Sequence, residues 1–412
     1  MALEYTDEQQ MLTDLTKPRI LLMGPRRSGK TSILRVVFQK MPPHETLFLE
    51  STHAVDIRLA NNNPFLQFQI WDFPGDFFFY RVSRNGGEGG GGGRELGGSM
   101  TQEGEGEGPK EGELLDEVGV FGVPAALVFV LDAQDEPYHE ALTRLVDLVA
   151  RGQSVNPSLH VVVFIHKVDG DLFLSDEHKV DCQRDVQHRI AQELRDASLE
   201  HVEVSCFLTS IYDHSIFEAF SKIVQRLTHQ LPVMENLLNY LISACKMEKS
   251  FLFDVVSRLY LATDSNPVDM QTYEMCVDMI DVVVDVSCIY GVKYDAEGEA
   301  QGPVYDSDSS STIHLSNGMV LYLREVDDYL AFVGLMRAEN FQKKGLIDFN
   351  IDCLKRSLGR LSSEGGSGGG GKGHVHEEKR NIMSGASRKG TPDPYQRIRN
   401  GPASMSDLLE IK

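Results

Sequence analysis

A short glycine-containing segment near the N-terminus has the residue types and spacing of a phosphate-binding loop. It runs Gly24-Pro25-Arg26-Arg27-Ser28-Gly29-Lys30-Thr31, a glycine and four residues followed by glycine, lysine and threonine. Backbone N–H groups of such a loop cradle the β-phosphate of a nucleotide, Lys30 would bridge the β- and γ-phosphates, and the Thr31 hydroxyl would ligate Mg²⁺. The predicted nucleotide-binding residues of this segment are Gly24, Arg26, Arg27, Ser28, Gly29, Lys30, Thr31 and Ser32.

A second segment, Asp72-Phe73-Pro74-Gly75, is suited to sense the third phosphate of a nucleotide. In phosphate-loop proteins, an aspartate at the end of a strand holds Mg²⁺ through water, and a glycine three residues later can offer its N–H to the γ-phosphate. Taken alone, these four residues form a common kind of turn. Because they follow the phosphate loop by one predicted hairpin, we expect Asp72 to serve the metal and Gly75 the γ-phosphate.

A third segment, His166-Lys167-Val168-Asp169, differs by one residue from the asparagine-lysine-x-aspartate signature with which GTPases read their base. The Asp169 carboxylate can accept from both N1–H and the exocyclic amine of guanine, whereas adenine presents an acceptor at N1. The stem of Lys167 can lie along the base. Further along, Thr209-Ser210-Ile211 stands where GTPases place the loop whose backbone N–H meets the guanine O6. We therefore predict guanine, with His166, Lys167, Asp169, Ser210 and Ile211 as binding residues.

Strands alternating with helices are expected to position these segments. An apolar run at Arg19–Met23 predicts a buried strand before the phosphate loop, and the apolar spacing from Ser32 to Met41 predicts a helix after it. Such alternation gives a mostly parallel sheet covered on both faces, with the ligand at the carboxyl ends of the strands. Further strands are predicted at residues 65–71, 123–131, 161–165 and about 202–208, and helices at residues 140–150, about 179–197 and 215–228.

The second half of the chain has the pattern of an interaction module, because residues 233–361 contain no second nucleotide signature. Strands are predicted at 251–262, 319–323 and 329–335, and a helix at 271–289. The predicted domains are a polar N-terminal segment (1–16), a G domain (17–230) with a disordered, glycine- and glutamate-rich insertion (81–113), an interaction domain (233–361) and a disordered tail (362–412).

Composition narrows the classes of partner. A formal net charge of −21 argues against a nucleic-acid partner, because an acidic surface repels phosphate backbones. The six cysteines are scattered without metal or redox spacing, which is typical of buried free thiols in a reducing compartment. No apolar run approaches membrane-spanning length, so we expect any membrane association to be indirect, through a partner.

The order of these segments and their residues resemble one family, the Rag/Gtr GTPases, and within it the C/D-type subunit. The resemblance covers most of the chain apart from the glycine-rich insertion and both ends, and agreement over two domains is more specific than any one motif. The segments that carry it are residues 17–24, 45–52, 68–75, 166–169 and 209–220 in the first domain, and residues 251–256, 262–264 and 345–348 beyond it.

The resemblance implies a fold and a biological role. The fold is α/β, a phosphate-loop G domain with a mostly parallel sheet followed by a roadblock-type α/β dimerisation domain that pairs with an A/B-type Rag subunit. The family's heterodimer sits on the lysosome or vacuole through a roadblock-rich scaffold and recruits the TOR kinase complex when amino acids are plentiful. This implies a cytoplasmic protein recruited to that membrane surface, and leaves the nucleus open as a further location.

The resemblance also implies ligands and roles for site residues. The cofactors are GTP or GDP with Mg²⁺, and Thr52 matches the switch threonine that joins Thr31 and Asp72 as a metal ligand in the triphosphate state. The implied catalytic set for GTP hydrolysis to GDP and phosphate is Lys30, Thr52, Gly75 and the residue after Gly75, which is Asp76 here.

Position 76 departs from the family pattern, in which a glutamine positions the attacking water. The Asp76 carboxylate would be repelled by the γ-phosphate and cannot donate as an amide does, so slow intrinsic hydrolysis is expected. The insertion also falls within what should be the second switch, so switching through this loop is open. Two alternatives therefore stand beside a switch GTPase: a pseudo-GTPase scaffold that holds guanine nucleotide with little turnover, and an unrelated phosphate-loop ATPase or kinase.

Overall fold

The computed structural model describes residues 17–77, 117–290, 293–294, 300–301, 309–365 and 410–411. The predicted N-terminal segment and the predicted insertion lie outside the described residues, as does most of the predicted tail. Contacts divide the chain into two compact units. The first draws its described residues from Met1–Thr31, Leu49–Arg58 and Gln69–Leu208, and the second from Ser32–Phe48, Leu59–Phe68 and Thr209–Lys412. The domain boundaries read from the sequence stay a prediction.

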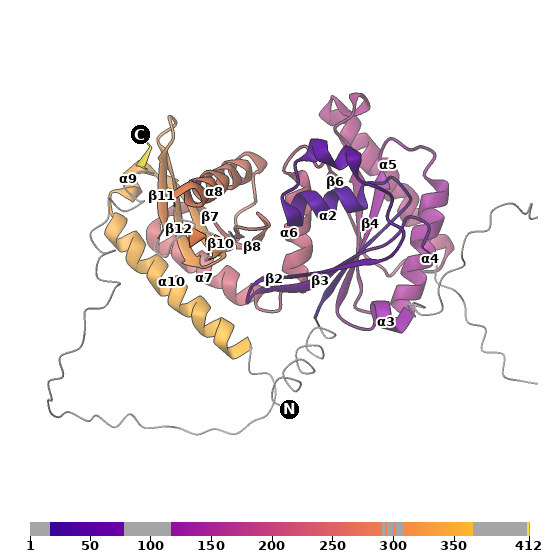
Figure 1. The fold of residues 1–412 in the computed structure, drawn as a ribbon, viewed down its shortest axis with the longest axis horizontal. Coiled ribbons are helices and arrows are strands. Elements are labelled where there is room, and N and C mark those ends of the chain that lie inside the picture. The colour runs from indigo at the N-terminus through magenta and orange to yellow at the C-terminus, as the bar shows by residue number, and fades with distance from the viewer. Residues whose placement is uncertain are drawn as a thin grey trace, which may run out of the picture. The chain divides into compact units, whose positions relative to one another are not determined.

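The first sheet has six strands in the order β2-β3-β1-β4-β5-β6. Strands β2, β3, β4 and β6 of this sheet are labelled in Figure 1. Strand β1 pairs in parallel with β3 and β4, and β4 pairs in parallel with β5. This is the mostly parallel α/β arrangement predicted from the alternating pattern. The strands are β1 (Arg19–Met23), β2 (Asp56–Asn63), β3 (Leu66–Asp72), β4 (Ala125–Asp132), β5 (His160–His166) and β6 (Val204–Thr209).

Helices follow these strands at the predicted places, with ends that differ by a few residues. The helix expected at 179–197 begins earlier, at Asp176, because the Ser175 side chain accepts from the N–H of His178 and caps it. The elements are α2 (Lys30–Gln39), η1 (Pro43–Phe48), α3 (Glu117–Phe121), α4 (His139–Val155), η2 (Asp171–Phe173), α5 (Asp176–Asp196) and α6 (Ser215–Leu227). Among the described residues, no helix has the length and apolarity needed to cross a membrane.

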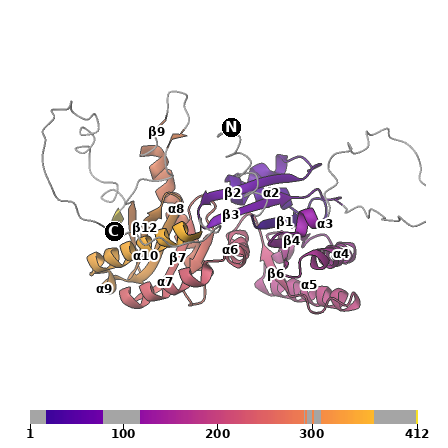
Figure 2. The same cartoon turned by 90° about the horizontal axis from the view of Figure 1, so that it is seen from below.

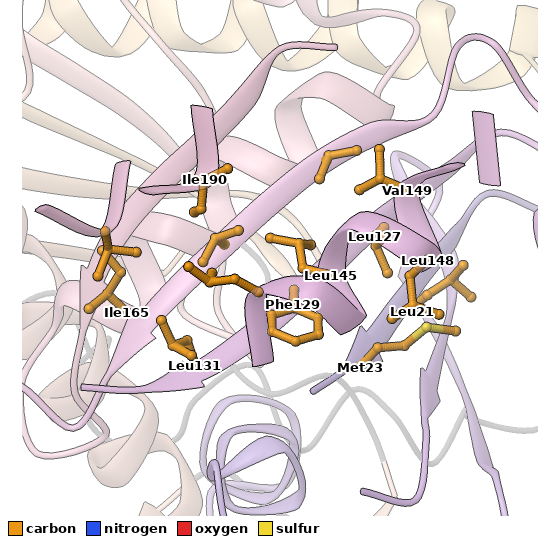
Figure 3. Packing of buried hydrophobic residues seen from close by; sticks show 14 of the residues in the cluster. Leu21, Met23, Leu127, Phe129, Leu131, Leu145, Leu148, Val149, Ile165 and Ile190 are labelled. Carbon is orange, nitrogen blue, oxygen red and sulfur yellow. The ribbon is translucent and has the colours of Figure 1, made fainter. Parts of the chain in front are cut away.

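The core of the first unit follows from the two-residue period of strand β4 and the helical spacing of α4. Every second β4 residue, Leu127, Phe129 and Leu131, belongs to one buried apolar cluster, which Figure 3 shows at close range. These side chains share the cluster with Leu145, Leu148 and Val149 of α4, Ile165 of β5, Ile190 of α5, and Leu21 and Met23 of β1. The packing fixes the carboxyl ends of β1, β4 and β5, where the sequence places the candidate site.

Next to this core, Arg19 and Trp71 face each other at the start of β1 and the end of β3. The Arg19 guanidinium lies 4.5 Å from the centroid of the Trp71 ring. The indole Nε1–H of Trp71 donates to the Gln69 side chain at 3.0 Å, and the ring is buried. Arg19 also donates to the main-chain carbonyls of Gly119 and Val120. Strand β3 is therefore anchored immediately before Asp72.

The second sheet has the order β14-β11-β12-β13-β7-β8, and β11, β12, β13, β7 and β8 pair antiparallel in turn. Helices α7 and α10 contact each other, and both lie along this sheet in Figures 1 and 2. The strands are β7 (Met247–Asp254), β8 (Tyr260–Thr263), β11 (Ser310–His314), β12 (Met319–Asp327), β13 (Leu330–Arg337) and β14 (Glu410–Ile411); the helices are α7 (Leu231–Cys245), α8 (Met270–Tyr290), α9 (Ala338–Phe341) and α10 (Lys344–Gly365). A separate pair joins β9 (Lys293–Tyr294) and β10 (Ala300–Gln301).

One sequence prediction for this half is wrong. The strand expected over residues 251–262 is two antiparallel strands, since the Asp254 carboxylate accepts from the Ser257 N–H and hydroxyl at 2.8 and 2.5 Å and closes a turn. Arg258, with φ of 62°, completes the reversal. Helix α10 runs to Gly365 and so overlaps the start of the predicted tail, most of which lies outside the described residues.

The β2–β3 hairpin meets this turn within the second unit. The side-chain oxygen of Asn63 accepts from the N–H groups of Phe65 and Leu66, at 3.0 and 2.9 Å, which forms the hairpin loop. The amide nitrogen of Asn63 donates to Asp254 Oδ1 at 2.8 Å. Both side chains are buried. The Asp254 carboxylate therefore joins the hairpin loop to the β7–β8 turn.

The cysteines only partly match the expectation of buried free thiols. Five of the six have side chains that the structure describes, and these five are free: Cys245 and Cys276 are buried, and Cys182, Cys206 and Cys353 are half-buried. Burial nevertheless raises the pKa of the Cys206 thiol to about 12. At neutral pH this thiol is protonated and a poor nucleophile.

Candidate nucleotide-binding site

The phosphate loop runs from β1 to α2 and contains two glycines, Gly24 and Gly29. Any other residue at either position would be strained. Gly24 has φ of +142°, and a Cβ there would lie 2.3 Å from the Val130 carbonyl oxygen. Gly29 has φ of +101°, and its Cβ would lie 2.7 Å from the His166 ring. Both glycines are thus required by close approach and by backbone conformation. The spacing read from the sequence has a steric cause.

Lys30 is held within this loop. Its ammonium donates to the carbonyl oxygens of Gly24 at 2.9 Å and Pro25 at 2.8 Å, and the side chain is buried. Burial lowers the pKa of Lys30 to about 8, an effect that the nearby Asp72 carboxylate opposes. The Ser28 hydroxyl donates to the Pro25 carbonyl at 3.0 Å and tightens the same turn. Lys30 is therefore poised at the loop, where an anionic ligand would stabilise its charge.

Two of the three predicted magnesium ligands, Thr52 and Asp72, lie within hydrogen-bond distance of the third, the Thr31 hydroxyl. Thr31 Oγ1 lies 2.6 Å from Asp72 Oδ2 and 2.7 Å from Thr52 Oγ1. Two hydroxyls and a carboxylate form an all-oxygen set, which is the donor chemistry that Mg²⁺ prefers, so the residues fit the ion. No cluster of three or more His, Cys, Asp or Glu side chains able to hold a metal occurs in the part of the chain that the structure describes. The threonine hydroxyls are thus essential to this candidate metal site.

The segment after Asp72 is pressed against the phosphate loop. A Cβ on Gly75 would lie within 2.4 to 2.6 Å of Arg26 atoms, backbone N and Cα included, so only glycine fits this approach. From α4, Arg144 donates to the carbonyl oxygen of Gly75 and, at 2.6 Å, to that of Phe77. Sequence reasoning missed Arg144, because nothing in its helical neighbourhood signals a contact with a loop more than sixty residues away.

Asp76 lies between those two carbonyls and faces cations. Its carboxylate is 3.9 Å from the Arg26 guanidinium, and the two side chains are 63% and 58% exposed. Its charge also contributes to raising the pKa of Lys30 and of Arg144, in both cases against the larger, lowering effect of burial. Exposed ion pairs of this kind contribute at most about 1 kcal/mol each. Asp76 therefore perturbs the charge of the phosphate site more than it stabilises the fold.

The base-recognition segment is tied to the phosphate loop through Lys167. Its ammonium donates to the Arg27 carbonyl at 2.7 Å and to the Asp132 carboxylate at 2.5 Å, and both Lys167 and Arg27 have positive φ. His166 is buried at the end of β5, and Asp169 is exposed and accessible to a ligand. Sequence reasoning did not single out Asp132, whose carboxylate orients Lys167.

The last two predicted base contacts and Ser32 belong to the second unit. The Ser210 N–H donates to the Ser215 hydroxyl at 3.0 Å, and the Ser210 hydroxyl accepts from the Tyr212 N–H at 3.0 Å. Ile211 is half-buried in the same loop, before α6, and Ser32 lies in the first turn of α2. The loop is thus ordered by its own side chains, and base contact by Ser210 and Ile211 stays a prediction.

The site described so far combines a phosphate loop with two required glycines, three oxygen ligands for a metal and a base-recognition segment. The sequence of the chain also matches a known family. The model of the Gtr1/RagA G protein conserved region matches residues 19–84 and 109–280. The chain belongs to the Rag/Gtr family. Proteins of this family are GTPases, so the ligand of this site is a guanine nucleotide, and the alternative of an unrelated ATPase or kinase is set aside.

Individual relatives place the chain among the C/D-type Rag proteins. It is 48% identical to human Ras-related GTP-binding protein C over 379 residues, which are 92% of this chain and 85% of the relative. It is 46% identical to the Schizosaccharomyces pombe GTP-binding protein gtr2 over 348 residues, 84% of this chain and 99% of the relative. A solved structure, Myxococcus xanthus MglB, aligns with 33% of this chain and 92% of its own at 10% identity, but its TM-score of 0.27 carries no argument about the fold.

Proposed function

We propose that this Rag C/D-type chain is the guanine-nucleotide switch subunit of a Rag-type heterodimer. In this proposal it relays amino-acid sufficiency to the TOR kinase complex at the lysosomal or vacuolar surface. The observation that carries the switch is the convergence of Thr52 and Asp72 on the Thr31 hydroxyl. Thr52 lies in a loop and Asp72 at the carboxyl end of β3, so a ligand at Thr31 bears on both segments at once. That coupling is what a nucleotide-dependent switch needs.

Each residue of the site has a proposed role in holding GTP. Lys30 would exchange its two carbonyl partners for phosphate oxygens, and the N–H groups of the loop would bind the β-phosphate. Thr31, Thr52 and Asp72 would hold Mg²⁺, which neutralises charge on the β- and γ-phosphates when bound. Asp169 would accept from guanine, and Lys167 would keep the base segment against the phosphate loop.

Hydrolysis by this site is proposed to be slow. Attack of water on the γ-phosphate requires a group that orients the water, and the family's glutamine does so through its amide. The carboxylate of Asp76 is acceptor-only when ionised and lies toward Arg26. GTP would still be converted to GDP and phosphate, with Lys30 and the Gly75 N–H stabilising the charge that develops. The low rate follows from the missing amide.

The presence of Asp76 in place of the family's glutamine also favours a second candidate, a pseudo-GTPase scaffold that holds guanine nucleotide with little turnover. Single-turnover hydrolysis of GTP by the full chain and by Asp76→Gln separates the two. A switch with slow chemistry should show measurable hydrolysis that rises about tenfold or more in the variant, as is typical when one catalytic donor is restored. No hydrolysis in either protein favours the scaffold, and fast hydrolysis in the unaltered chain excludes it.

The C-terminal half is proposed to be the roadblock-type dimerisation domain that pairs with an A/B-type Rag subunit. Its antiparallel sheet with flanking helices is consistent with an interaction module. Co-expression of the full chain with an A/B-type subunit, followed by size-exclusion chromatography and identification of the released nucleotides, tests the pairing. A 1:1 complex carrying guanine nucleotide supports it. Elution as separate proteins would remove the heterodimer and, with it, the proposed scaffold, TOR complex and lysosomal recruitment.

A further inference from the structure

The loop that carries Asp76 contacts Arg26 of the phosphate loop and Arg144 of helix α4. Gly75 touches the Arg26 backbone so closely that a Cβ would come within 2.5 Å of its Cα. The carbonyls of Gly75 and Phe77, on either side of Asp76, both accept from the guanidinium of Arg144, a half-buried residue. The backbone on both sides of Asp76 is therefore held, which keeps its exposed carboxylate close to Arg26.

That place is among the cations of the phosphate site. Arg26 lies 3.9 Å from the Asp76 carboxylate. The Lys30 ammonium donates to the carbonyl of Pro25, the residue before Arg26, and Arg144 donates to the carbonyls on either side of Asp76. Asp76 thus places one negative charge beside Arg26 and in the neighbourhood of two further positive groups, and Lys30 and Arg26 belong to the phosphate loop itself. The charge is supplied by the protein rather than by a nucleotide.

We propose that Asp76 is a specificity-determining residue that lowers the affinity of the site for GTP relative to GDP, by acting as a built-in anion among Arg26, Lys30 and Arg144. This inference rests on the proposed guanine-nucleotide site and adds a nucleotide preference to it. It is separate from the rate of hydrolysis, since it concerns equilibrium binding.

The sign follows from charge alone. GTP carries one more phosphate than GDP, and that phosphate brings negative charge toward cations that Asp76 already attracts. Binding GTP must therefore either separate Asp76 from Arg26 or hold two like charges near each other, whereas GDP demands neither. Because Asp76 and Arg26 are exposed, solvent screens the repulsion between Asp76 and the γ-phosphate. We therefore expect one charge at Asp76 to favour GDP over GTP by about fivefold.

The experiment is equilibrium competition of GDP and of the slowly hydrolysed analogue GTPγS against radiolabelled GDP, with excess Mg²⁺, using the full chain. Three variants are compared with it. Asp76→Asn removes the charge and keeps the shape, Asp76→Glu keeps the charge, and Asp196→Asn removes an exposed charge at the end of α5 as a matched control. The measured quantity is the ratio of the GTPγS and GDP dissociation constants.

We expect this ratio to fall about fivefold in Asp76→Asn, to stay near the unaltered value in Asp76→Glu and Asp196→Asn, and the effect of Asp76→Asn to shrink at high salt. A ratio unchanged in Asp76→Asn overturns the inference while leaving guanine-nucleotide binding intact. An equal fall in Asp76→Glu also overturns it, since shape rather than charge would then decide. Absence of binding of either nucleotide to the unaltered chain would refute the proposed function itself.

Discussion

Replacing Asn63 by alanine tests whether the β2–β3 hairpin depends on the Asp254 turn. The Asn63 side chain makes three buried hydrogen bonds: its oxygen accepts from Phe65 and Leu66, and its nitrogen donates to Asp254. Alanine leaves two backbone N–H groups without this acceptor and removes a donor from a buried carboxylate. Each buried group left unsatisfied costs about 1 to 3 kcal/mol, with partial relief from water. We expect Asn63→Ala to lower the free energy of unfolding by about 3 kcal/mol.

The matched control is Asn317→Ala. Asn317 is exposed and makes one comparable bond, its side-chain oxygen accepting from the Met319 N–H at 3.0 Å. Water can replace that bond, so the expected loss is at most about 0.5 kcal/mol. Urea unfolding of the full chain, followed by far-ultraviolet circular dichroism, gives both values. Losses for the two variants that agree within about 0.5 kcal/mol would refute the reasoning, because the buried bonds would then contribute nothing special.

Asp254→Asn gives a second reading of the same contact. The new amide could keep one oxygen toward Ser257, but its NH₂ would then face the Asn63 NH₂, donor against donor. Asn63 cannot rotate to resolve this, since its oxygen is held by the hairpin N–H groups. We therefore expect a loss of about 2 to 4 kcal/mol for this nearly isosteric change. A neutral outcome would show that the carboxylate is not required.

Three further predictions concern the site and the second unit. Thr31→Ala should speed GDP release about tenfold with Mg²⁺ present and leave the rate in EDTA unchanged, because only the metal-bound state loses a ligand. Gly75→Ala should weaken guanine-nucleotide binding about tenfold or more, since its Cβ would meet the Arg26 backbone at 2.5 Å. Glu218→Gln should gain stability over the unaltered chain as pH rises from 4 to 7. Burial raises the pKa of Glu218, so the folded state holds its proton longer, and stability is lost as pH rises through that pKa.

Matched controls for these three variants come from the same chain. Thr143→Ala changes an exposed threonine of α4, Gly359→Ala adds a Cβ with nothing within 4 Å, and Glu177→Gln alters an exposed glutamate of α5. Release rates, binding constants and urea midpoints should stay at the unaltered values in these controls. The first argument would be contradicted if Thr31→Ala sped GDP release equally with Mg²⁺ and with EDTA. The second would be contradicted if Gly75→Ala bound guanine nucleotide as tightly as the unaltered chain. The third would be contradicted if the stability difference between Glu218→Gln and the unaltered chain did not change with pH.

Local chemistry explains what could be predicted from the sequence. Strand β1 lies at Arg19–Met23 as predicted, since a short apolar run before a glycine loop has few other solutions. The hairpin before Asp72 was predicted, but the bounds of β2 were not, because Asp56, Arg58 and three asparagines make this strand polar, and its place at the edge of the sheet tolerates that. The strand predicted across residues 251–262 failed for a related reason, because two polar residues, Asp254 and Ser257, turn the chain inside an apolar run.

The candidate site shows the same division. The motifs predicted Thr31 and Asp72 as metal ligands, the family resemblance implied Thr52, and the three side chains do meet. Arg144 was beyond reach, because its function is to hold two main-chain carbonyls, and carbonyls have no sequence signature. The orientation of Asp76 toward Arg26 was equally invisible, since it depends on how that loop is fastened.

The placement of Trp71 gives the chain an optical reporter of its own. It is the single tryptophan in the sequence, and it is followed directly by Asp72. Its indole is buried beneath the Arg19 guanidinium, 4.5 Å away, so its emission depends on a nearby charge and on the strand end that carries the candidate metal ligand. Intrinsic fluorescence excited at the red edge of protein absorption therefore reports on one position only. Nucleotide and magnesium titrations can be followed on the unmodified protein, without labelled ligands or introduced dyes.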